Sequence, residues 1–196
     1  MPRCGGLNRF LLTLMMGCWM PYENKTGLPS VTQILRPFID TKWFTEDCRA
    51  RGSAVHTACY SELMGLYTVP LPLAWQRYVD SFKRWLDATS PRVILAEKRL
   101  QNKMFCGQLD FYGEIDGRTG PGVIDFKTGQ QFHKWHRLQG AAYRALVEPE
   151  GGSAWGGNLR LKKDGSMPIF DPWPDNPQPD YYTFLDAFKV WRFFND

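Results

Sequence analysis

The chain lacks the features that define several common protein classes. Its five cysteines are an odd, scattered set without a Cys-x-x-Cys pair, which argues against a disulfide framework and against a zinc ribbon. Such cysteines fit a reducing compartment, so a cytoplasmic protein is expected. No apolar run is long enough to span a bilayer, and no membrane partner is expected. There is no Gly-x-x-x-x-Gly-Lys frame, which excludes a Walker-type nucleotide site.

The N-terminal segment has a superficial likeness to a signal peptide. Arg3 and Arg9 precede an apolar run over residues 10–20, but no Ala-x-Ala-like cleavage site follows it. We therefore expect residues 1–29 to form an extension upstream of the domain, or a helix packed on it, rather than an export signal.

The bulk composition is that of one ordinary globular domain. The 196 residues are enough to bury a real core, and 43% of them are hydrophobic. A net charge of +4 permits a nucleic-acid partner without requiring one. We expect a single domain over residues 30–196, with a helical part over 30–90, a sheet core over 91–165 and a C-terminal helix over 180–195.

Periodicity and turn signals predict helices, then strands, then a helix and a strand. Ser30 is the expected N-cap of a helix that begins at Val31. Further helices are expected over 47–66, 73–89, 132–147 and 181–194, and strands over 92–100, 104–115, 122–127 and 155–162. The Pro-rich stretch 167–179 is expected to be a loop. This order predicts an α/β fold with a central mixed β-sheet flanked by helices and preceded by a helical region.

Chemistry concentrates at the strand over residues 122–127. Side chains alternate along a strand, so Asp125 and Lys127 point to the same side. A second acid, Asp110, lies fifteen residues upstream. Two carboxylates and an ammonium on one sheet face can hold a divalent cation against a phosphate, which is the chemistry of phosphodiester cleavage. An Asp-x-Lys pair by itself would more often be a salt bridge at a sheet edge.

Four motifs follow one another along the chain: Gly52-Ser53-Ala54-Val55-His56, Gly107-Gln108-Leu109-Asp110, Asp125-Phe126-Lys127 and Gln139-Gly140-Ala141-Ala142-Tyr143. This ordered set resembles the PD-(D/E)XK nucleases, and within them the RecB-like branch with its phage-type exonucleases. The resemblance covers about residues 30–143 and implies a restriction-endonuclease-like αβββαβ core. Two departures are visible: Leu109 stands where the family name has proline, and no cysteine follows Cys106, so no iron–sulfur cluster is expected.

The resemblance implies a metal site and a catalytic lysine. Asp110, Asp125, His56 and the backbone carbonyl of Phe126 would bind Mg²⁺ or Mn²⁺. Lys127 would orient or deprotonate the attacking water, or neutralise the transition state, and the choice between these roles stays open. Outside its motif, His56 would more often be a core or helix-surface histidine.

Further candidates surround this set. Glu97, placed at the end of the first strand, is the candidate supporting carboxylate, although a solvated charge is an equal alternative. Gln139 and Tyr143 lie one helical turn apart, and the resemblance implies that their helix holds the DNA strand. An ordinary amphipathic helix edge is the alternative. Basic residues beside that helix are candidates for phosphate contacts: Lys134, Arg137 and Arg144.

Other aromatic and histidine residues have simpler interpretations. His133 and His136 have the spacing of a metal pair, but no cysteine or second histidine pair accompanies them, so a zinc site is not expected. Trp75, Trp85 and Trp135 are expected in the core rather than as stacking platforms for bases.

The sequence thus predicts a Mg²⁺- or Mn²⁺-dependent deoxyribonuclease, an exonuclease rather than an endonuclease, with a role in phage or bacterial recombination and repair. The expected partner is DNA, as single strands or duplex ends. The alternatives are a structure- or site-specific endonuclease of the same fold and a catalytically silent DNA-binding module. The sequence leaves open the polarity of cleavage, the preference for single- or double-stranded substrates and the choice between DNA and RNA. It also leaves open whether the chain assembles into a homo-oligomer or with a recombination partner protein.

Overall fold

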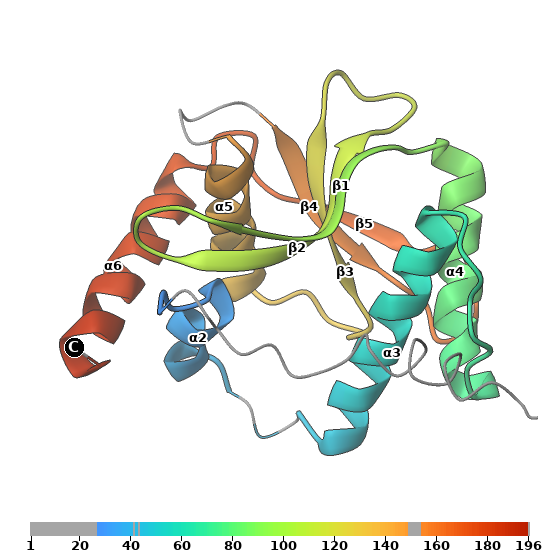
Figure 1. Ribbon diagram of the computed structural model, residues 1–196, viewed down its shortest axis with the longest axis horizontal. Coiled ribbons are helices and arrows are strands. Elements are labelled where there is room, and N and C mark those ends of the chain that lie inside the picture. Colours follow the sequence, from blue (N-terminus) through green and yellow to red (C-terminus); the bar gives the residue numbers. More distant parts are fainter. Residues whose placement is uncertain (1–26, 41, 43, 149–153, 196) are drawn as a thin grey trace, which may run out of the picture.

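The computed structural model describes residues 27–40, 42, 44–148 and 154–195. Nearly all of the predicted extension, residues 1–29, lies outside this range. The predicted α/β class, a central mixed sheet flanked by helices, is confirmed (Figure 1). None of the helices in the described ranges is both long and apolar enough to cross a membrane.

The sheet has five strands in the spatial order in which they occur in the chain. Neighbouring strands pair antiparallel, except for β3 and β4, which are parallel because α5 crosses between them. The strands are β1 (Arg92–Gln101), β2 (Cys106–Glu114), β3 (Gly122–Lys127), β4 (Trp155–Arg160) and β5 (Ile169–Pro172).

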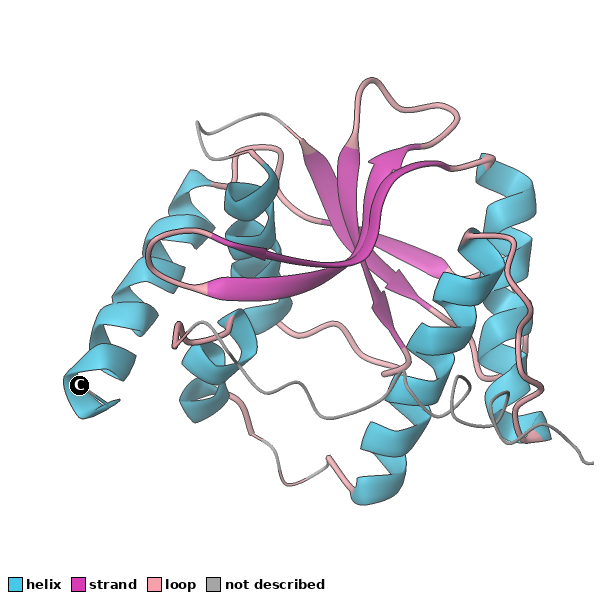
Figure 2. Cartoon of the chain, viewed as in Figure 1, coloured by secondary structure: helices cyan, strands magenta, loops and turns pink. Residues whose placement is uncertain are grey.

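The helices form a layer on each side of the sheet (Figure 2). One layer contains α2 (Val31–Leu35), which continues into a short 3₁₀ turn (Arg36–Phe38), together with α5 (Trp135–Val147) and α6 (Gln178–Asn195). The opposite layer contains α3 (Glu46–Leu63) and α4 (Leu73–Thr89). Each layer encloses its own apolar cluster, and the sheet separates the two clusters.

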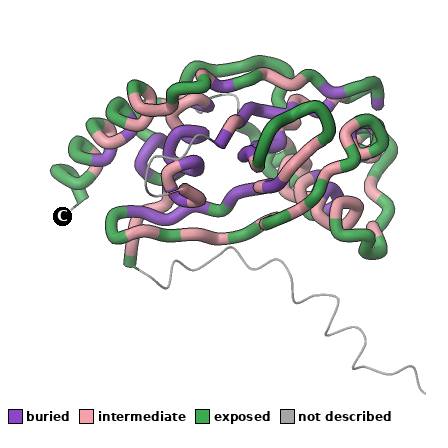
Figure 3. Tube along the Cα trace, turned by 90° about the horizontal axis from the view of Figure 1, so that it is seen from above, coloured by how far each residue is buried: buried purple, intermediate pink, exposed green. Residues whose placement is uncertain are grey.

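Local sequence signals explain most element boundaries. The predicted N-cap Ser30 forms a full capping box with Gln33, since its hydroxyl accepts from the Gln33 N–H at 3.2 Å and the Gln33 side chain accepts from the Ser30 N–H at 2.8 Å. The C-terminal helix α6 packs on the fold through its aromatic residues. Phe184 and Phe188 are buried in the first cluster, and Tyr181 and Trp191 pack against it. The rest of α6 is largely exposed (Figure 3).

Two predictions are wrong. Residues 169–172, expected within a loop, form the edge strand β5, which an ion pair between Arg160 and Asp171 ties to β4. Pro168 and Pro172 disguised this strand, because proline is tolerated at sheet edges but reads as a breaker. Glu97 does not end β1: the strand continues to Gln101, and Glu97 lies inside it with φ of +45°.

The register of the sheet places three acids in one row. Phe111 pairs with Ile124, so the next position sets Asp110 opposite Asp125. Ala96 pairs with Phe111 and Lys98 with Leu109, so Glu97 lies opposite Asp110 on the other side. Directly opposed residues share a sheet face, and like charges in such pairs are destabilising. The fold therefore assembles negative charge where β1, β2 and β3 adjoin.

Candidate active site

A cavity of about 820 Å³ contains this row of acids. Its walls come from α3, β1, β2, β3, the loop after β3 and α5, which are far apart in the sequence. The sequence-predicted residues His56, Glu97, Asp110, Asp125, Phe126, Lys127, Gln139 and Tyr143 all line it.

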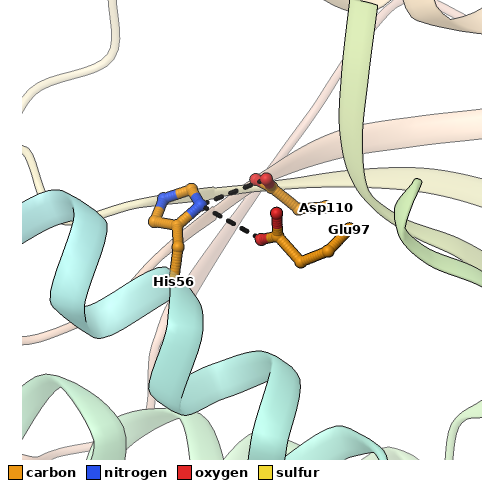
Figure 4. Close-up of side chains that lie close together, drawn as sticks. All are labelled: His56, Glu97 and Asp110. Atoms are coloured by element: carbon orange, nitrogen blue, oxygen red, sulfur yellow. Dashed lines mark hydrogen bonds and ion pairs between the residues drawn. The ribbon is translucent and has the colours of Figure 1, made fainter. Parts of the chain in front are cut away.

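Three side chains converge closely enough to bind one cation. His56, from the middle of α3, points toward the two acids (Figure 4). Its Nδ1 lies 3.1 Å from Oδ1 of Asp110 and 3.7 Å from Oε1 of Glu97. One donor atom from each residue lies within 4.8 Å of the others, and within the described ranges this is the group of histidine, cysteine and acidic side chains with that property.

The cluster has the chemistry of a divalent-cation site. Oε1 of Glu97 is buried and has no hydrogen bond among the described residues, which is costly for a carboxylate. Burial alone would lower the pKa of His56, but the carboxylates of Asp110 and Glu97 outweigh it and raise that pKa well above its usual value. In the protein without metal, the imidazolium thus supplies the positive charge that the acids require. One nitrogen and two carboxylates fit Mn²⁺ or Mg²⁺.

The backbone fixes the orientation of Asp110. Its Oδ2 accepts a hydrogen bond of 2.6 Å from the backbone N–H of Phe126, which leaves Oδ1 directed at His56. The Phe126 ring packs in the core beneath the site. Phe126 thus contributes through its N–H, and the ligand role predicted for its carbonyl stays a prediction.

Asp125 and Lys127 form a buried pair beside the cluster. Nζ of Lys127 lies 2.5 Å from Oδ2 of Asp125, whose residue is only 4% exposed. Burial raises the pKa of Asp125 to about 6, with a further contribution from Asp110, although Lys127 opposes the shift. Asp125 is therefore held by the lysine and lies next to the three converging residues rather than among them.

The helix α5 also holds Lys127. Nζ of Lys127 donates to Oε1 of Gln139 at 2.9 Å, and Nε2 of Gln139 donates to the hydroxyl of Tyr143 at 3.0 Å. The ammonium also lies 5.4 Å from the centroid of the Trp135 ring. Burial, with added repulsion from Asp125 and Asp110, raises the pKa of Tyr143, so the hydroxyl keeps its proton. Gln139 and Tyr143 are buried. Gln139 holds the lysine directly, and Tyr143 holds Gln139.

The glycine before Gln108 allows this arrangement. A Cβ on Gly107 would lie 2.7 Å from Cε1 of Tyr143, so a side chain there would displace the tyrosine ring. In contrast, a Cβ on Gly52 would lie 3.9 Å from the hydroxyl of Thr128, which is an ordinary contact. The close approach of β2 to α5 thus requires glycine at position 107, whereas space alone does not require it at position 52.

The basic residues predicted to bind DNA lie outside the cavity lining. Arg137 makes a bidentate pair with Asp180 of α6, with both bonds at 2.9 Å. Arg144 is 3% exposed and donates to the backbone carbonyls of Pro174 and Asp175. Lys134 is exposed at the N-cap of α5. The first two side chains therefore fasten α5 to neighbouring segments, and the DNA contacts predicted for all three residues stay predictions.

His133 and His136 both line the cavity, and His133 is exposed whereas His136 is buried. His136 is buried, and its Nδ1 accepts a hydrogen bond of 3.3 Å from the His133 backbone N–H. Burial, with the nearby charge of Lys127, lowers the pKa of His136 to about 2, so this ring stays neutral.

Sequence reasoning did not single out two residues of the site. Trp135, expected in the core, faces the lysine from the cavity wall. Gln108 donates from Nε2 to Oε2 of Glu97 at 2.5 Å. The available signal for Gln108 was the strand period, since a residue two positions before Asp110 must share its face.

Sequence comparison identifies no relative, as no family model and no curated protein matches the chain. The fold is similar to the crystal structure of an alkaline exonuclease from Laribacter hongkongensis, with 12% identity, a TM-score of 0.34 and coverage of 86% of this chain and 92% of that one. A structure of that protein in complex with dAMP gives 16% identity, a TM-score of 0.37 and coverage of 84% and 87%. Similarity at this level assigns no activity.

Proposed function

We propose that the chain is a metal-dependent DNA nuclease of the PD-(D/E)XK class, in its RecB-like branch, that cleaves from strand ends in recombination or repair. One observation carries the proposal. A single cavity contains the converging group of His56, Glu97 and Asp110 beside the buried pair of Asp125 and Lys127. The sequence motifs independently favour the same chemistry.

The metal would be held by His56, Glu97 and Asp110, with Asp125 adjacent. A bound Mg²⁺ or Mn²⁺ supplies polarisation of the scissile phosphate and a coordinated water of lowered pKa. Two hard carboxylates suit either ion, and the imidazole nitrogen makes Mn²⁺ the stronger activator in this proposal. Asp110 is the ligand best fixed by the chain, because the Phe126 N–H restrains its second oxygen.

Lys127 acts as a positive charge near the scissile phosphate. Its three described contacts, to the Asp125 carboxylate, to the amide oxygen of Gln139 and to the Trp135 ring, are each favourable to an ammonium. This environment supports neutralisation of transition-state charge over removal of a proton from water. Gln139 and Tyr143 then position the lysine, and this role is separate from the DNA contact that the resemblance implies for them.

The cavity walls also offer surfaces for nucleobases. Phe44 lines the cavity beside the start of α3 and is 43% exposed, and the exposed ring of His133 lines it from the loop before α5. Aromatic rings at a site rim stack on bases without regard to sequence. These surfaces support a nucleic-acid strand as substrate and favour unpaired ends.

The test is digestion of DNA labelled at the 5′ or 3′ end, in single- and double-stranded form, with Mg²⁺, Mn²⁺ or EDTA. Asp125→Ala and Lys127→Ala should each abolish cleavage while DNA binding in a mobility-shift assay persists. A closed circular substrate should be spared, because it has no end. Cleavage in EDTA, or by either variant at the wild-type rate, would refute the metal-lysine site, and cleavage of the circle would make the enzyme an endonuclease.

A further inference from the structure

Glu97 has two carboxylate oxygens in different situations. Oε2 accepts the 2.5 Å hydrogen bond from Nε2 of Gln108. Oε1 is buried, faces Nδ1 of His56 at 3.7 Å and has no hydrogen bond among the described residues. One oxygen is thus tethered by Gln108, and the other faces His56, where a cation would bind.

Glu97 has a strained backbone and a carboxylate that lies beside another acid. Its φ of +45° lies in the left-handed region, which side chains other than glycine adopt only under constraint. The register also places Glu97 opposite Asp110, and the two carboxylates repel each other. The ion pair with His56 attracts Oε1 of Glu97, so a contact to Oε2 is needed to fix the orientation of the whole carboxylate.

Gln108 provides that contact from the strand that carries Asp110. Residues 108 and 110 are two apart on β2, so both side chains lie on the cavity face of the sheet. A neutral amide suits the position because it donates a hydrogen bond without adding charge to the cluster. One strand therefore supplies a metal ligand together with the group that aims a second ligand.

We propose that Gln108 is the positioning residue for Glu97 and sets the affinity of the His56–Glu97–Asp110 site for its divalent cation. This inference rests on the proposed function only for the presence of the metal site. Hydrogen bonds to a ligating carboxylate typically change metal affinity 10- to 100-fold when removed. Loss of the Gln108 amide should weaken binding by about that factor and leave the fold intact.

The experiment measures Mn²⁺ binding to the full chain without DNA, by electron paramagnetic resonance of the free ion and by calorimetry. Gln108→Met keeps the side-chain length and removes the donor. Gln131→Met is the matched control, since Gln131 lines the same cavity from the loop after β3. We expect a Kd about 10- to 100-fold higher for Gln108→Met, an unchanged Kd for Gln131→Met, and equal thermal midpoints in EDTA for all three proteins.

Activity gives a second readout. With DNA, Gln108→Met should need about 10- to 100-fold more Mn²⁺ for half-maximal cleavage and approach the wild-type kcat at saturating Mn²⁺. A Mn²⁺ Kd within twofold of wild type would overturn the inference, as would equal weakening by Gln131→Met. Weaker Mn²⁺ binding by Gln108→Met in a protein that cleaves no DNA would support the inference and refute the proposed function. Absence of Mn²⁺ binding by the wild type would overturn both.

Discussion

Replacement of Asp125 by asparagine should stabilise the protein in the absence of metal. The carboxylate is almost fully buried, and its β4 neighbour Asn158 is completely buried. Burial and the nearby Asp110 raise the pKa of Asp125 from 3.8 to about 6 even with Lys127 beside it. The folded state therefore resists ionisation of this group more than the unfolded chain does.

The sign of the pH dependence follows from linkage. As the pH rises from about 4 to about 6, the unfolded chain releases the proton of Asp125 first, so the free energy of unfolding falls. A shift of about two pKa units corresponds to about 3 kcal/mol, at 1.36 kcal/mol per unit. This destabilisation is absent below pH 4 and complete at about pH 7. Asparagine resembles the protonated acid and carries no charge, so the variant avoids this destabilisation.

Urea unfolding in EDTA at several pH values measures the effect. Asp125→Asn should exceed the wild type in unfolding free energy by up to about 3 kcal/mol at pH 7.5, and the difference should shrink toward pH 4. The exposed Asp40 offers a control, since Asp40→Asn should show no comparable trend. Addition of Mn²⁺ should reduce this difference in unfolding free energy, because metal binding stabilises the wild type more than the variant. A variant less stable than the wild type at pH 7.5, or a gap independent of pH, would refute the reasoning.

Three further predictions follow from the contacts of α5. Gln139→Leu removes the acceptor of Lys127 and should lower kcat about 10- to 100-fold, the equivalent of one charge-assisted hydrogen bond, with the Mn²⁺ Kd unchanged in calorimetry. A changed Kd would place Gln139 in the metal site instead. Gly107→Ala should lower the unfolding free energy by about 1–3 kcal/mol, because its Cβ meets the ring of Tyr143; Gly107→Ala combined with Tyr143→Leu should recover part of this loss. Arg144→Met should lower the unfolding free energy by about 1–3 kcal/mol, since the carbonyls of Pro174 and Asp175 lose their buried donor, and a higher KM for DNA at unchanged stability would show a phosphate contact instead.

The fold was largely predictable because its signals are local. The N-cap at Ser30, the helical periodicity of residues 73–89 and the alternation around Asp125 are each signals within one element, and the N-cap and the alternation matched the structure residue for residue. The limits of α4 and β3 also matched. The edge strand β5 was missed since its main stabilising contacts come from β4, through the Arg160–Asp171 pair and backbone pairing between residues 9–15 positions apart.

For the candidate site, too, some features could be predicted from the sequence and others could not. Which residues gather could be predicted from motif order, and His56, Glu97, Asp110, Asp125 and Lys127 do line one cavity. How they pair could not, because pairing depends on side-chain rotamers and strand register. The positive φ of Glu97 has no sequence signature, and the strand period places Gln108 on the face of Asp110 without showing that it bonds Glu97. Arg137 and Arg144 were predicted from charge alone, and charge does not distinguish a phosphate ligand from a partner of Asp180 or of a carbonyl.

The arrangement of charges favours the binding of a cation among His56, Glu97 and Asp110. Three acids lie in a row across β1, β2 and β3, yet of these three acids Lys127 pairs only with Asp125, at one end of the row. Glu97 and Asp110 depend on the His56 imidazolium, which burial disfavours. A divalent ion at His56 would replace that proton and relieve the repulsion between the two acids at once. Metal binding should therefore release about one proton at neutral pH, and titration calorimetry in two buffers of different ionisation enthalpy would measure it.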